Sequence, residues 1–579
     1  MTNTFLMPRP EHPKPQFMRQ NWMNLNGEWQ FEKDQSRSGR ERELYKEEAV
    51  LNSRITVPFC PESRLSGLED KDFMSGVWYK RRVTLEKTDG LTRLHFGAAD
   101  YHTFVFVNGQ FAGEHQGGYV SFFADVTPFV REGENDITVY CEDDARDPLI
   151  PSGKQSDRHK SYGCMYTRTT GIWQTVWLEF LPKTHIESVK YDTNIADAAV
   201  TVTAFLSGKA PLDAVVSFEG RTVGTYHNDA AAGVLTFTVP LAEKHLWDVG
   251  QGNLYDVALS FGEDRVESYF GLRTVRFDGM RFMLNDRPVF QRLVLDQGFY
   301  PDGIYTAPTD EALENDIRLS QKAGFNGARL HEKIFEERFL YHADRLGYLV
   351  WGEYPDWGLD HSDPLNVYSI LPEWTEEILR DRNHPAIIGW CPHNETWDHA
   401  FRRQYSDAIR LLYRTTKALD PTRPCIDTSG NFHVETDVFC LHDYDQNPET
   451  FGARYTPLAE GKAHVDRFSD RQTYRGEPVM LSEYGGIGWI VDTAEWGYGA
   501  GHGWGYGNGP KTIEEYYERL RGLTNALLNN PALFGFCFTQ LTDVEQERNG
   551  IYTYNRKEKF DMAVIREIFG AKAAMEEEN

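Results

Sequence analysis

The chain has 579 residues, of which 40% are hydrophobic and 26% are charged. This length suits about three or four domains, and the composition is ordinary for a globular protein with large cores. The net charge of −26 argues against nucleic acids and anionic membrane surfaces as partners, because both favour clusters of Lys and Arg.

The N-terminal segment and the cysteines indicate a compartment. The first residues lack the apolar stretch of a secretory signal, and no run approaches the roughly 20 apolar residues that span a bilayer. The seven Cys are scattered, and none forms a C-x-x-C pair. We therefore expect buried free thiols in a reducing compartment, and hence a cytoplasmic protein unless a signal was removed.

Short apolar runs separated by turns fill the first half of the chain, without intervening helices. Trp78–Leu85 and Thr103–Val107 are examples, and the second is followed by Asn108-Gly109, a strong hairpin signal. This pattern predicts a β-sandwich over residues 1–182. Residues 183–275 continue with about seven runs, which is typical of a small immunoglobulin-like sandwich.

Residues 276–579 alternate apolar runs with helical stretches, which indicates parallel βαβ units. Eight runs are predicted strands: Val289–Leu295, Gly327–Leu330, Tyr348–Gly352, Ala386–Cys391, Cys425–Thr428, Val438–Leu441, Pro478–Ser482 and Phe534–Phe538. The predicted helices include Asp310–Ala323, Glu373–Arg382, Phe401–Leu419 and Ile513–Leu528. The pattern predicts a (β/α)₈ barrel, with a doubly wound sheet as the alternative.

Polar side chains follow almost every predicted strand. Barrel enzymes work at the carboxyl ends of their strands, so these residues are candidates for a site. They are Asp296, Gln297, His331, Glu332, Glu353, His393, Asn394, Glu395, Trp397, His442, Asp443, Tyr444, Glu483, Tyr484, Gln540 and Asp543. One such residue is more often structural than functional, but a whole ring is hard to explain by stability alone.

Two glutamates in this ring predict glycoside hydrolysis. Glu395 and Glu483 each end a buried apolar run, and burying a carboxylate is costly unless a partner or a substrate compensates. Paired carboxylates hydrolyse glycosides, one as a proton donor and one as a nucleophile. We expect Glu395, beside Trp390 and Trp397, to be the acid/base in an apolar surrounding. We expect Glu483 to be the nucleophile, kept ionised by Tyr444.

The remaining candidates are expected to contact the sugar. The loop from Gly485 to Gly509 is rich in Gly and carries Trp489, Trp496, Tyr498, Trp504 and Tyr506, which form either a sugar-stacking wall or a satellite core. Trp357 is a weaker candidate of the same kind. The predicted substrate-binding residues are Asp296, His331, Asn394, Trp397, His442, Tyr444 and Trp489.

Collinear motifs along nearly the whole chain resemble those of glycoside hydrolase family 2. They are Gly76-Val-Trp-Tyr79, Val107-Asn-Gly109, Thr170–Trp177, Phe325–His331, Arg382-Asn-His-Pro385, Asn394-Glu395 and Ser482–Gly486. The resemblance implies a jelly-roll domain, an immunoglobulin-like domain and a catalytic (β/α)₈ barrel. It also implies retaining hydrolysis, with Glu395 as acid/base and Glu483 as nucleophile.

The chain departs from the family pattern at two places. The glucuronidase branch binds the sugar carboxylate through an Asn-x-Lys motif, where this chain has Glu547-Arg-Asn-Gly-Ile-Tyr552. Arg548 could still meet an acid, so a glucuronide is disfavoured without being excluded. The family's large β-galactosidases hold Mg²⁺ through a Glu-x-His, where this chain has Glu353-Tyr-Pro355. We therefore expect no essential metal and no cofactor.

These observations favour a retaining exo-glycosidase acting on a neutral, galactose-like terminal sugar of an oligosaccharide or glycoside. A β-glucuronide, a β-glucoside or an arabinose-configured residue is the alternative within the class. A carbohydrate-binding scaffold that has lost activity is the alternative of another class, against which the presence of both glutamates counts. The first domain is expected to complete the rim of the barrel or to make a homo-oligomer contact.

Overall fold

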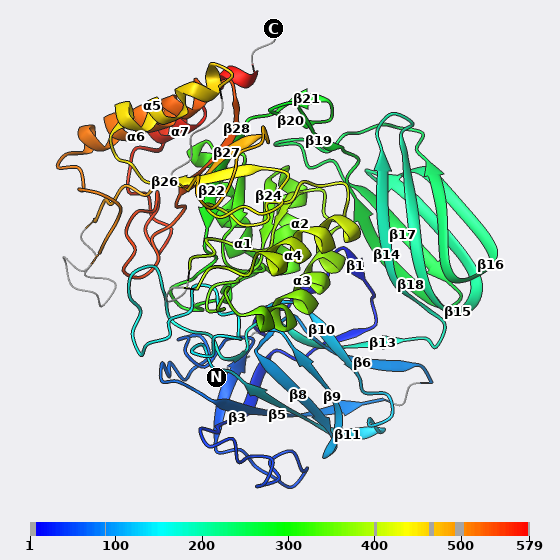
Figure 1. The fold of residues 1–579 in the computed structure, drawn as a ribbon. Helices are drawn as coiled ribbons and strands as arrows, with labels where there is room; N and C mark the ends of the chain where they lie inside the picture. The colour runs from blue at the N-terminus through cyan, green and yellow to red at the C-terminus, as the bar shows by residue number, and fades with distance from the viewer. Residues whose placement is uncertain (1–6, 87–88, 399–401, 463–467, 492–502, 577–579) are drawn as a thin grey trace.

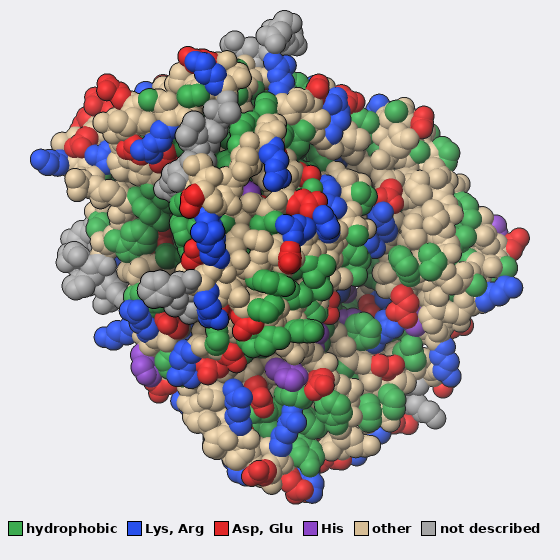
Figure 2. Space-filling model, viewed as in Figure 1, with side chains coloured by type: hydrophobic (Ala, Val, Ile, Leu, Met, Phe, Trp, Pro, Cys, Tyr) green, Lys and Arg blue, Asp and Glu red, His purple; other side chains and the backbone are tan. Residues whose placement is uncertain are grey.

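A computed structural model of the chain describes residues 7–86, 89–398, 402–462, 468–491 and 503–576. It confirms the predicted fold class, a central barrel flanked by two β-sandwiches (Figure 1). Figure 2 shows acidic and basic side chains mixed over one face, so the large negative charge is not gathered into a single patch there. No helix among the described residues is long and apolar enough to cross a membrane.

The first sandwich consists of two antiparallel sheets. Its six-stranded sheet contains β4 (Ser53–Val57), β3 (Gly27–Lys33), β5 (Gly76–Leu85), β11 (Gly133–Glu142), β8 (His102–Val107) and β9 (Gln110–Gln116). Its four-stranded sheet contains β10 (Phe122–Asp125), β6 (Leu91–Phe96), β13 (Val176–Leu181) and β2 (Trp22–Asn24). The short strands β7 (Ala99–Asp100) and β12 (Gly171–Ile172) pair separately. Asn108 and Gly109 both have positive φ in the two-residue turn between β8 and β9, as the hairpin signal predicts.

The second sandwich has fewer and longer strands than the sequence pattern suggests. Its strands are β1 (Phe17–Met18), β14 (His185–Asn194), β15 (Ala199–Phe218), β16 (Arg221–Pro240), β17 (Tyr255–Phe261) and β18 (Asp264–Phe270). Strands β15 and β16 pair over most of their length with three register shifts, and such bulges bend a strand. Apolar runs at 200–205 and 215–218, which look like separate strands in the sequence, therefore belong to the single strand β15.

Seven parallel strands form the barrel, in the order β25-β24-β23-β22-β28-β27-β26. They are β22 (Gln291–Asp296), β23 (Gly327–Leu330), β24 (Leu349–Glu353), β25 (Ile387–Cys391), β26 (Phe439–Asp443), β27 (Val479–Gly485) and β28 (Leu533–Thr539). The predicted strand at 425–428 makes only isolated bridges, Trp390 to Cys425 and, just beyond, Asn394 to Ser429. Side-chain hydrogen bonds, such as that of Asp427 to the Val434 amide, hold this segment instead.

Helices cover the outside of the barrel. They are α1 (Asp310–Ala323), α2 (Glu337–Leu346), α3 (Val367–Asp381), α4 (Ser406–Leu419), α5 (Pro448–Ala459), α6 (Ile513–Leu528) and α7 (Met562–Phe569), with short 3₁₀ turns η1 (Pro364–Asn366) and η3 (Ala574–Glu576). The small sheet of β19 (Val275–Asp278), β20 (Arg281–Leu284) and β21 (Arg287–Pro288) precedes β22, and its Phe282 packs near Phe534 at the start of β28. This sheet therefore lies at the amino ends of the barrel strands, opposite the predicted site.

A buried carboxylate joins the second sandwich to the barrel. Asp344, near the end of α2, accepts hydrogen bonds from the Ala386 amide (2.9 Å) and the Tyr269 hydroxyl (2.9 Å), and lies 2.6 Å from His384 Nδ1. Its backbone carbonyl accepts a hydrogen bond from Trp247 of the second sandwich. Burial lowers the pKa of His384, but the adjacent Asp344 carboxylate raises it overall, so the two form a buried ion pair.

We predict that Asp344→Ala destabilises the full chain by about 3–5 kcal/mol, because it leaves a buried positive charge and a buried amide without a partner. The measurement is the urea midpoint of unfolding at neutral pH. Asp407→Ala is the matched control, since it breaks an exposed ion pair with Arg410 on α4 and should cost about 1 kcal/mol or less. Equal midpoints for the two variants would contradict the structural role of Asp344.

Candidate active site

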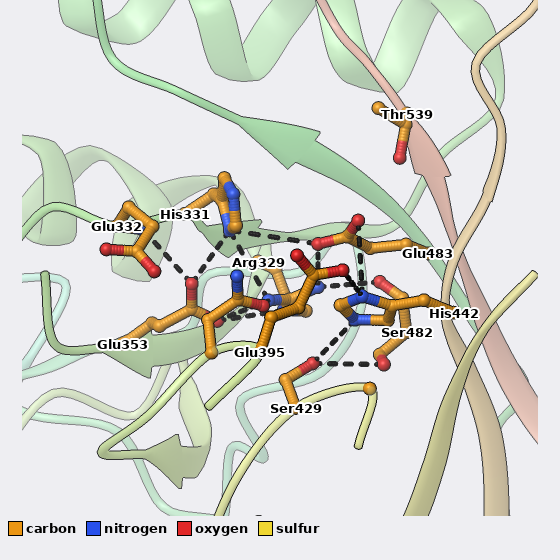
Figure 3. Close-up of polar contacts among 12 residues, drawn as sticks. Arg329, His331, Glu332, Glu353, Glu395, Ser429, His442, Ser482, Glu483 and Thr539 are labelled. Atoms are coloured by element: carbon orange, nitrogen blue, oxygen red, sulfur yellow. Dashed lines mark hydrogen bonds and ion pairs between the residues drawn. The ribbon is translucent and has the colours of Figure 1, made fainter. Parts of the chain in front are cut away.

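The carboxyl ends of the barrel strands bring the predicted residues together. His331 follows β23, Asn394 and Glu395 lie on the loop after β25, and His442 and Glu483 lie near the ends of β26 and β27. Adjacent strand ends meet at one edge of a parallel barrel, which is why residues so distant in sequence become neighbours. Figure 3 shows the side chains of Glu395 and Glu483 directed toward the same space, with His442 beside both.

The two glutamates lie at the separation that a retaining glycosidase needs. One carboxylate oxygen of Glu395 and one of Glu483 lie within 4.8 Å of each other. Retaining enzymes place their carboxyl groups about 5–5.5 Å apart, whereas inverting enzymes leave about 6.5–9.5 Å for a water molecule. The geometry therefore suits direct attack by one carboxylate rather than by an intervening water.

Glu483 is held as an anion by donors on two sides. Arg329 Nη1 lies 3.2 Å from Oε1, and the Tyr444 hydroxyl donates to Oε2 at 2.5 Å. Burial raises the pKa of Glu483, and Glu395 adds to this, but the charges of His442, His331 and Arg329 lower it overall. An ionised carboxylate in this position can attack an anomeric carbon, which is the role predicted for Glu483.

Arg329 lies at the base of the site and hydrogen-bonds several of its residues. It was not predicted as a site residue. It is fully buried and donates to Glu353 Oε2 from Nε and Nη2, to the Ser482 carbonyl and to Asn394 Oδ1. Glu353 in turn lies 2.8 Å from His331 Nδ1. A charged residue inside the apolar strand Gly327–Leu330 was a usable signal, because a fully buried Arg requires ionised partners.

Glu395 lies in a polar surrounding, and the prediction of an apolar one is wrong. Its carboxylate lies 2.6 Å from His442 Nδ1 and accepts a hydrogen bond from Trp397 Nε1 at 3.3 Å. Trp390 instead packs in the core and hydrogen-bonds Asp420. Burial raises the pKa of Glu395, but the hydrogen bond and charge of His442 lower it to about 2.

The contact between Glu395 and His442 gives Glu395 a neighbour with which it can exchange a proton. Ser482 donates to the Leu441 carbonyl, Ser429 donates to Ser482, and His442 Nε2 lies 3.0 Å from Ser429 Oγ. These contacts orient the imidazole so that its Nδ1 lies 2.6 Å from the Glu395 carboxylate, a distance across which a proton can pass.

Asn394 and Trp397 lie beside the catalytic residues, and their contact with a substrate remains a prediction. Asn394 Oδ1 accepts from Arg329, whereas the buried Nδ2 has no hydrogen-bond partner among the described residues and can donate to a sugar hydroxyl. Trp397 is 46% exposed and packs edge-on against Phe432 and Phe468, so one part of the ring remains accessible at the mouth.

Asp296 and Trp489, two of the predicted substrate-binding residues, contact residues other than the catalytic glutamates. Asp296 accepts a hydrogen bond from the Gly298 amide, and burial together with the charge of Asp316 raises its pKa to about 7. Within the described part of the chain, no hydrogen bond or ion pair joins Asp296 to either catalytic glutamate. Trp489 packs near Tyr516 and Phe560, as expected for the satellite-core alternative.

The glycine-rich loop contributes Tyr506 to the site. Its ring stacks on that of Tyr444 with centroids 3.5 Å apart, which fixes the tyrosine that donates to Glu483. Trp504 donates to the Gly163 carbonyl of the first domain. Trp496 and Tyr498 lie outside the described residues.

The segment just before Gly550 contains an acidic side chain, Glu547, and an amide side chain, Asn549. Glu547 accepts hydrogen bonds from the Tyr166 hydroxyl (2.5 Å) and from Asn549 Nδ2 (3.0 Å). Arg548 instead lines a separate cavity at the boundary with the first domain, beside Glu545 and Tyr554. The suggestion that Arg548 meets an acidic sugar in the catalytic site is therefore not supported by its position.

One donor set at the site could hold a metal ion. The donor atoms of Glu395, His442 and Glu483 lie within 4.8 Å of one another, and these are the same groups that the hydrolytic reaction requires. Glu353, which matches the Glu of the Mg²⁺ motif, is already bonded to Arg329, His331 and the Glu332 amide. The expectation that no metal is essential remains a prediction.

Comparisons with known proteins match most of the chain. "Glycosyl hydrolases family 2, sugar binding domain" matches residues 22–178, "Glycosyl hydrolases family 2" matches 184–273, and "Glycosyl hydrolases family 2, TIM barrel domain" matches 306–489. The beta-glucuronidase from Ruminococcus gnavus, solved in complex with D-glucuronic acid, has a TM-score of 0.78 at 19% identity and covers 97% of this chain and 100% of its own.

Several relatives are similar in sequence. A putative beta-glucuronidase of Formosa agariphila is 29% identical over 56% of this chain and 40% of its own length. A beta-galactosidase of Thermoanaerobacter pseudethanolicus is 28% identical over 66% of this chain and 52% of its own length. A beta-glucuronidase of Felis catus is 26% identical over 80% of this chain and 77% of its own length. The chain thus spans about half of the length of the first two relatives.

We predict that Tyr444→Phe moves the acidic limb of the kcat/KM profile to higher pH by about one unit. The hydroxyl stabilises ionised Glu483, and a charge-assisted hydrogen bond contributes about 1.5–3 kcal/mol, where 1.36 kcal/mol corresponds to one pKa unit. A nucleophile with a higher pKa is protonated earlier as the pH falls. Tyr484→Phe is the control, because that hydroxyl faces Thr524 instead. An acidic limb that stays in place in Tyr444→Phe would contradict the assignment.

Proposed function

Because the chain belongs to glycoside hydrolase family 2, we propose that it hydrolyses a terminal β-linked sugar with retention of anomeric configuration. The separation of Glu395 and Glu483, whose carboxylate oxygens lie within 4.8 Å of each other, carries this proposal. A binding scaffold without activity would not need this separation of the two carboxylates.

The reaction follows from the positions of the side chains. Glu395, after taking the proton shared with His442, donates it to the glycosidic oxygen while Glu483 attacks the anomeric carbon. The bond to the leaving group breaks and a glycosyl ester with Glu483 forms. Glu395, now a carboxylate, removes a proton from water, which attacks the same carbon and releases Glu483. Asn394 Nδ2 supplies a hydrogen bond to a sugar hydroxyl throughout.

Two sugar classes fit this chemistry. β-Glucuronides are the first, because relatives and solved structures that cover 80% and 97% of this chain are named beta-glucuronidases. A neutral, galactose-like sugar is the second, because Glu547 and Asn549 offer no cation in the segment where the glucuronidase branch has its Lys. One relative is also named beta-galactosidase.

We also infer a cytoplasmic location from the cysteines. All seven are free thiols, as predicted, and six of them are buried. Their state is compatible with a reducing compartment. A homo-oligomer contact through the first domain remains a prediction.

We predict that Glu483→Ala abolishes turnover and that Glu395→Gln has a selective effect. Glu395→Gln should slow nitrophenyl or alkyl glycosides by about 10²–10⁴-fold, but dinitrophenyl glycosides much less, because a good leaving group needs no proton. Turnover is measured on a panel of aryl glycosides, and the first-formed anomer is identified by NMR.

Glu514→Gln, an exposed residue on α6, is the control for the glutamate substitutions and should behave as the unmodified chain. If Glu395→Gln lost the same fraction of turnover on substrates with good and with poor leaving groups, the acid role of Glu395 would be refuted. An inverted product would refute the retaining mechanism.

A further inference from the structure

A lysine of the first domain is fixed at the barrel mouth by its backbone. Lys154 lies on the segment between β11 and β12, which leaves the first sandwich and runs beside the barrel (Figure 1). The amides of Ser152 and Gly153 donate to the Trp357 carbonyl at 2.7 and 3.0 Å, and the Lys154 carbonyl accepts from the Tyr166 amide at 2.7 Å. Both domains therefore determine where the Lys154 side chain begins.

The Lys154 side chain is mostly buried, and its ammonium group has no ionic partner among the described residues. The residue is 4% exposed, and Nζ lies 3.4 Å from the centroid of the Trp357 ring. Within the part of the chain that the structure describes, no hydrogen bond or ion pair joins Nζ to a protein group. A cation–π contact compensates only part of the cost of burying an ammonium, which has three donors to satisfy.

The same ammonium lies near both catalytic carboxylates. The Trp357 indole, over which Nζ lies, donates to the Asn394 carbonyl at 2.9 Å, which places the lysine next to the residue that precedes Glu395. Burial lowers the pKa of Lys154, but the charges of Cys164, Glu332, Glu395 and Glu483 raise it overall, so the group stays charged. Among the described residues, no ion pair joins Nζ to either glutamate.

No other cation beside the two glutamates is available to a substrate among the described residues. Arg329 is engaged by Glu353, Glu483 and Asn394. Lys333 donates to the carbonyls of Gly298 and Tyr305. Lys154 is thus the cation with unused donors.

We propose that Lys154 binds the carboxylate of a uronic acid in the catalytic site and so determines specificity for acidic sugars. This inference rests on the proposed glycosidase function and selects the glucuronide alternative within it. The positive charge that meets the sugar carboxylate then comes from the first domain and not from the segment after the last barrel strand. A chain with Glu547 and Asn549 in that segment can therefore still accept an acidic sugar.

The test compares 4-nitrophenyl β-D-glucuronide with 4-nitrophenyl β-D-glucoside, which differ only at C6. Lys154→Met should lower kcat/KM for the glucuronide by 100-fold or more, because a charge-assisted hydrogen bond to its carboxylate is lost. The same substitution should change kcat/KM for the glucoside, which has no carboxylate, by less than about threefold. Lys154→Arg should recover part of the glucuronide activity. Lys160→Met, on an exposed lysine of the same segment, is the matched control and should change neither substrate.

The outcomes separate this inference from the proposed function. Equal losses on both substrates in Lys154→Met, at an unchanged thermal midpoint, would show a general electrostatic or structural role and overturn the inference. Glu483-dependent turnover of neutral glycosides alone would also overturn it, while leaving the glycosidase function intact. Absence of turnover on every glycoside of the panel, by contrast, would overturn the proposed function itself.

Discussion

The close approach of two buried carboxylates is the constraint on which the rest of the site depends. Two like charges at this separation repel by an amount of the order of 3 kcal/mol at an effective dielectric constant of about 20. Arg329 and Tyr444 stabilise Glu483, and His442 lies beside both carboxylates. The two glutamates thereby have different hydrogen-bond partners, while neighbouring charges lower the pKa of both.

The same constraint explains the polar network beneath the site. Arg329 is a buried cation that needs partners of its own, and Glu353 supplies two hydrogen bonds to it. Glu353 also positions His331, and the serines 429 and 482 fix the orientation of His442. A network of this kind holds its members in one geometry only if each of them is satisfied.

The barrel does not form the site alone. The segment that carries Lys154 and Tyr166 comes from the first sandwich, and it is bonded to Trp357 and Glu547 of the barrel. Glu373 of α3 accepts the backbone amides of Tyr119 and Val120, which holds the same two domains together. The first domain therefore completes the rim of the site, one of the two roles expected for it.

Much of the fold could be predicted from the sequence because it follows local periodicity. Helices Asp310–Ala323 and Ile513–Leu528 begin and end as predicted, since Thr309 and Thr512 cap them and the apolar spacing is regular. The strand predicted at 425–428 does not form, because side-chain hydrogen bonds replace backbone pairing in this segment. Such side-chain bonds leave no periodic pattern in the sequence from which they could be predicted.

Site residues at the carboxyl ends of barrel strands could be predicted from the sequence, whereas a site residue from another domain could not. Glu395, Glu483 and Tyr444 were predicted because parallel strands bring their carboxyl ends together. Lys154 was missed because its position depends on how one domain docks on another. The surroundings of Glu395 were also mispredicted, since the neighbours in sequence, such as Trp390, face the core while His442 comes from a later strand.

Covalent trapping identifies the nucleophile of the reaction. A 2-deoxy-2-fluoro glycosyl fluoride of the accepted sugar should form a long-lived ester with the nucleophile, because fluorine slows both steps and fluoride leaves without a proton. We expect a mass increase of one fluoro-sugar on the peptide that contains Glu483, and none in Glu483→Ala. A label on any other residue, or turnover of natural glycosides without a trapped ester on Glu483, would contradict it.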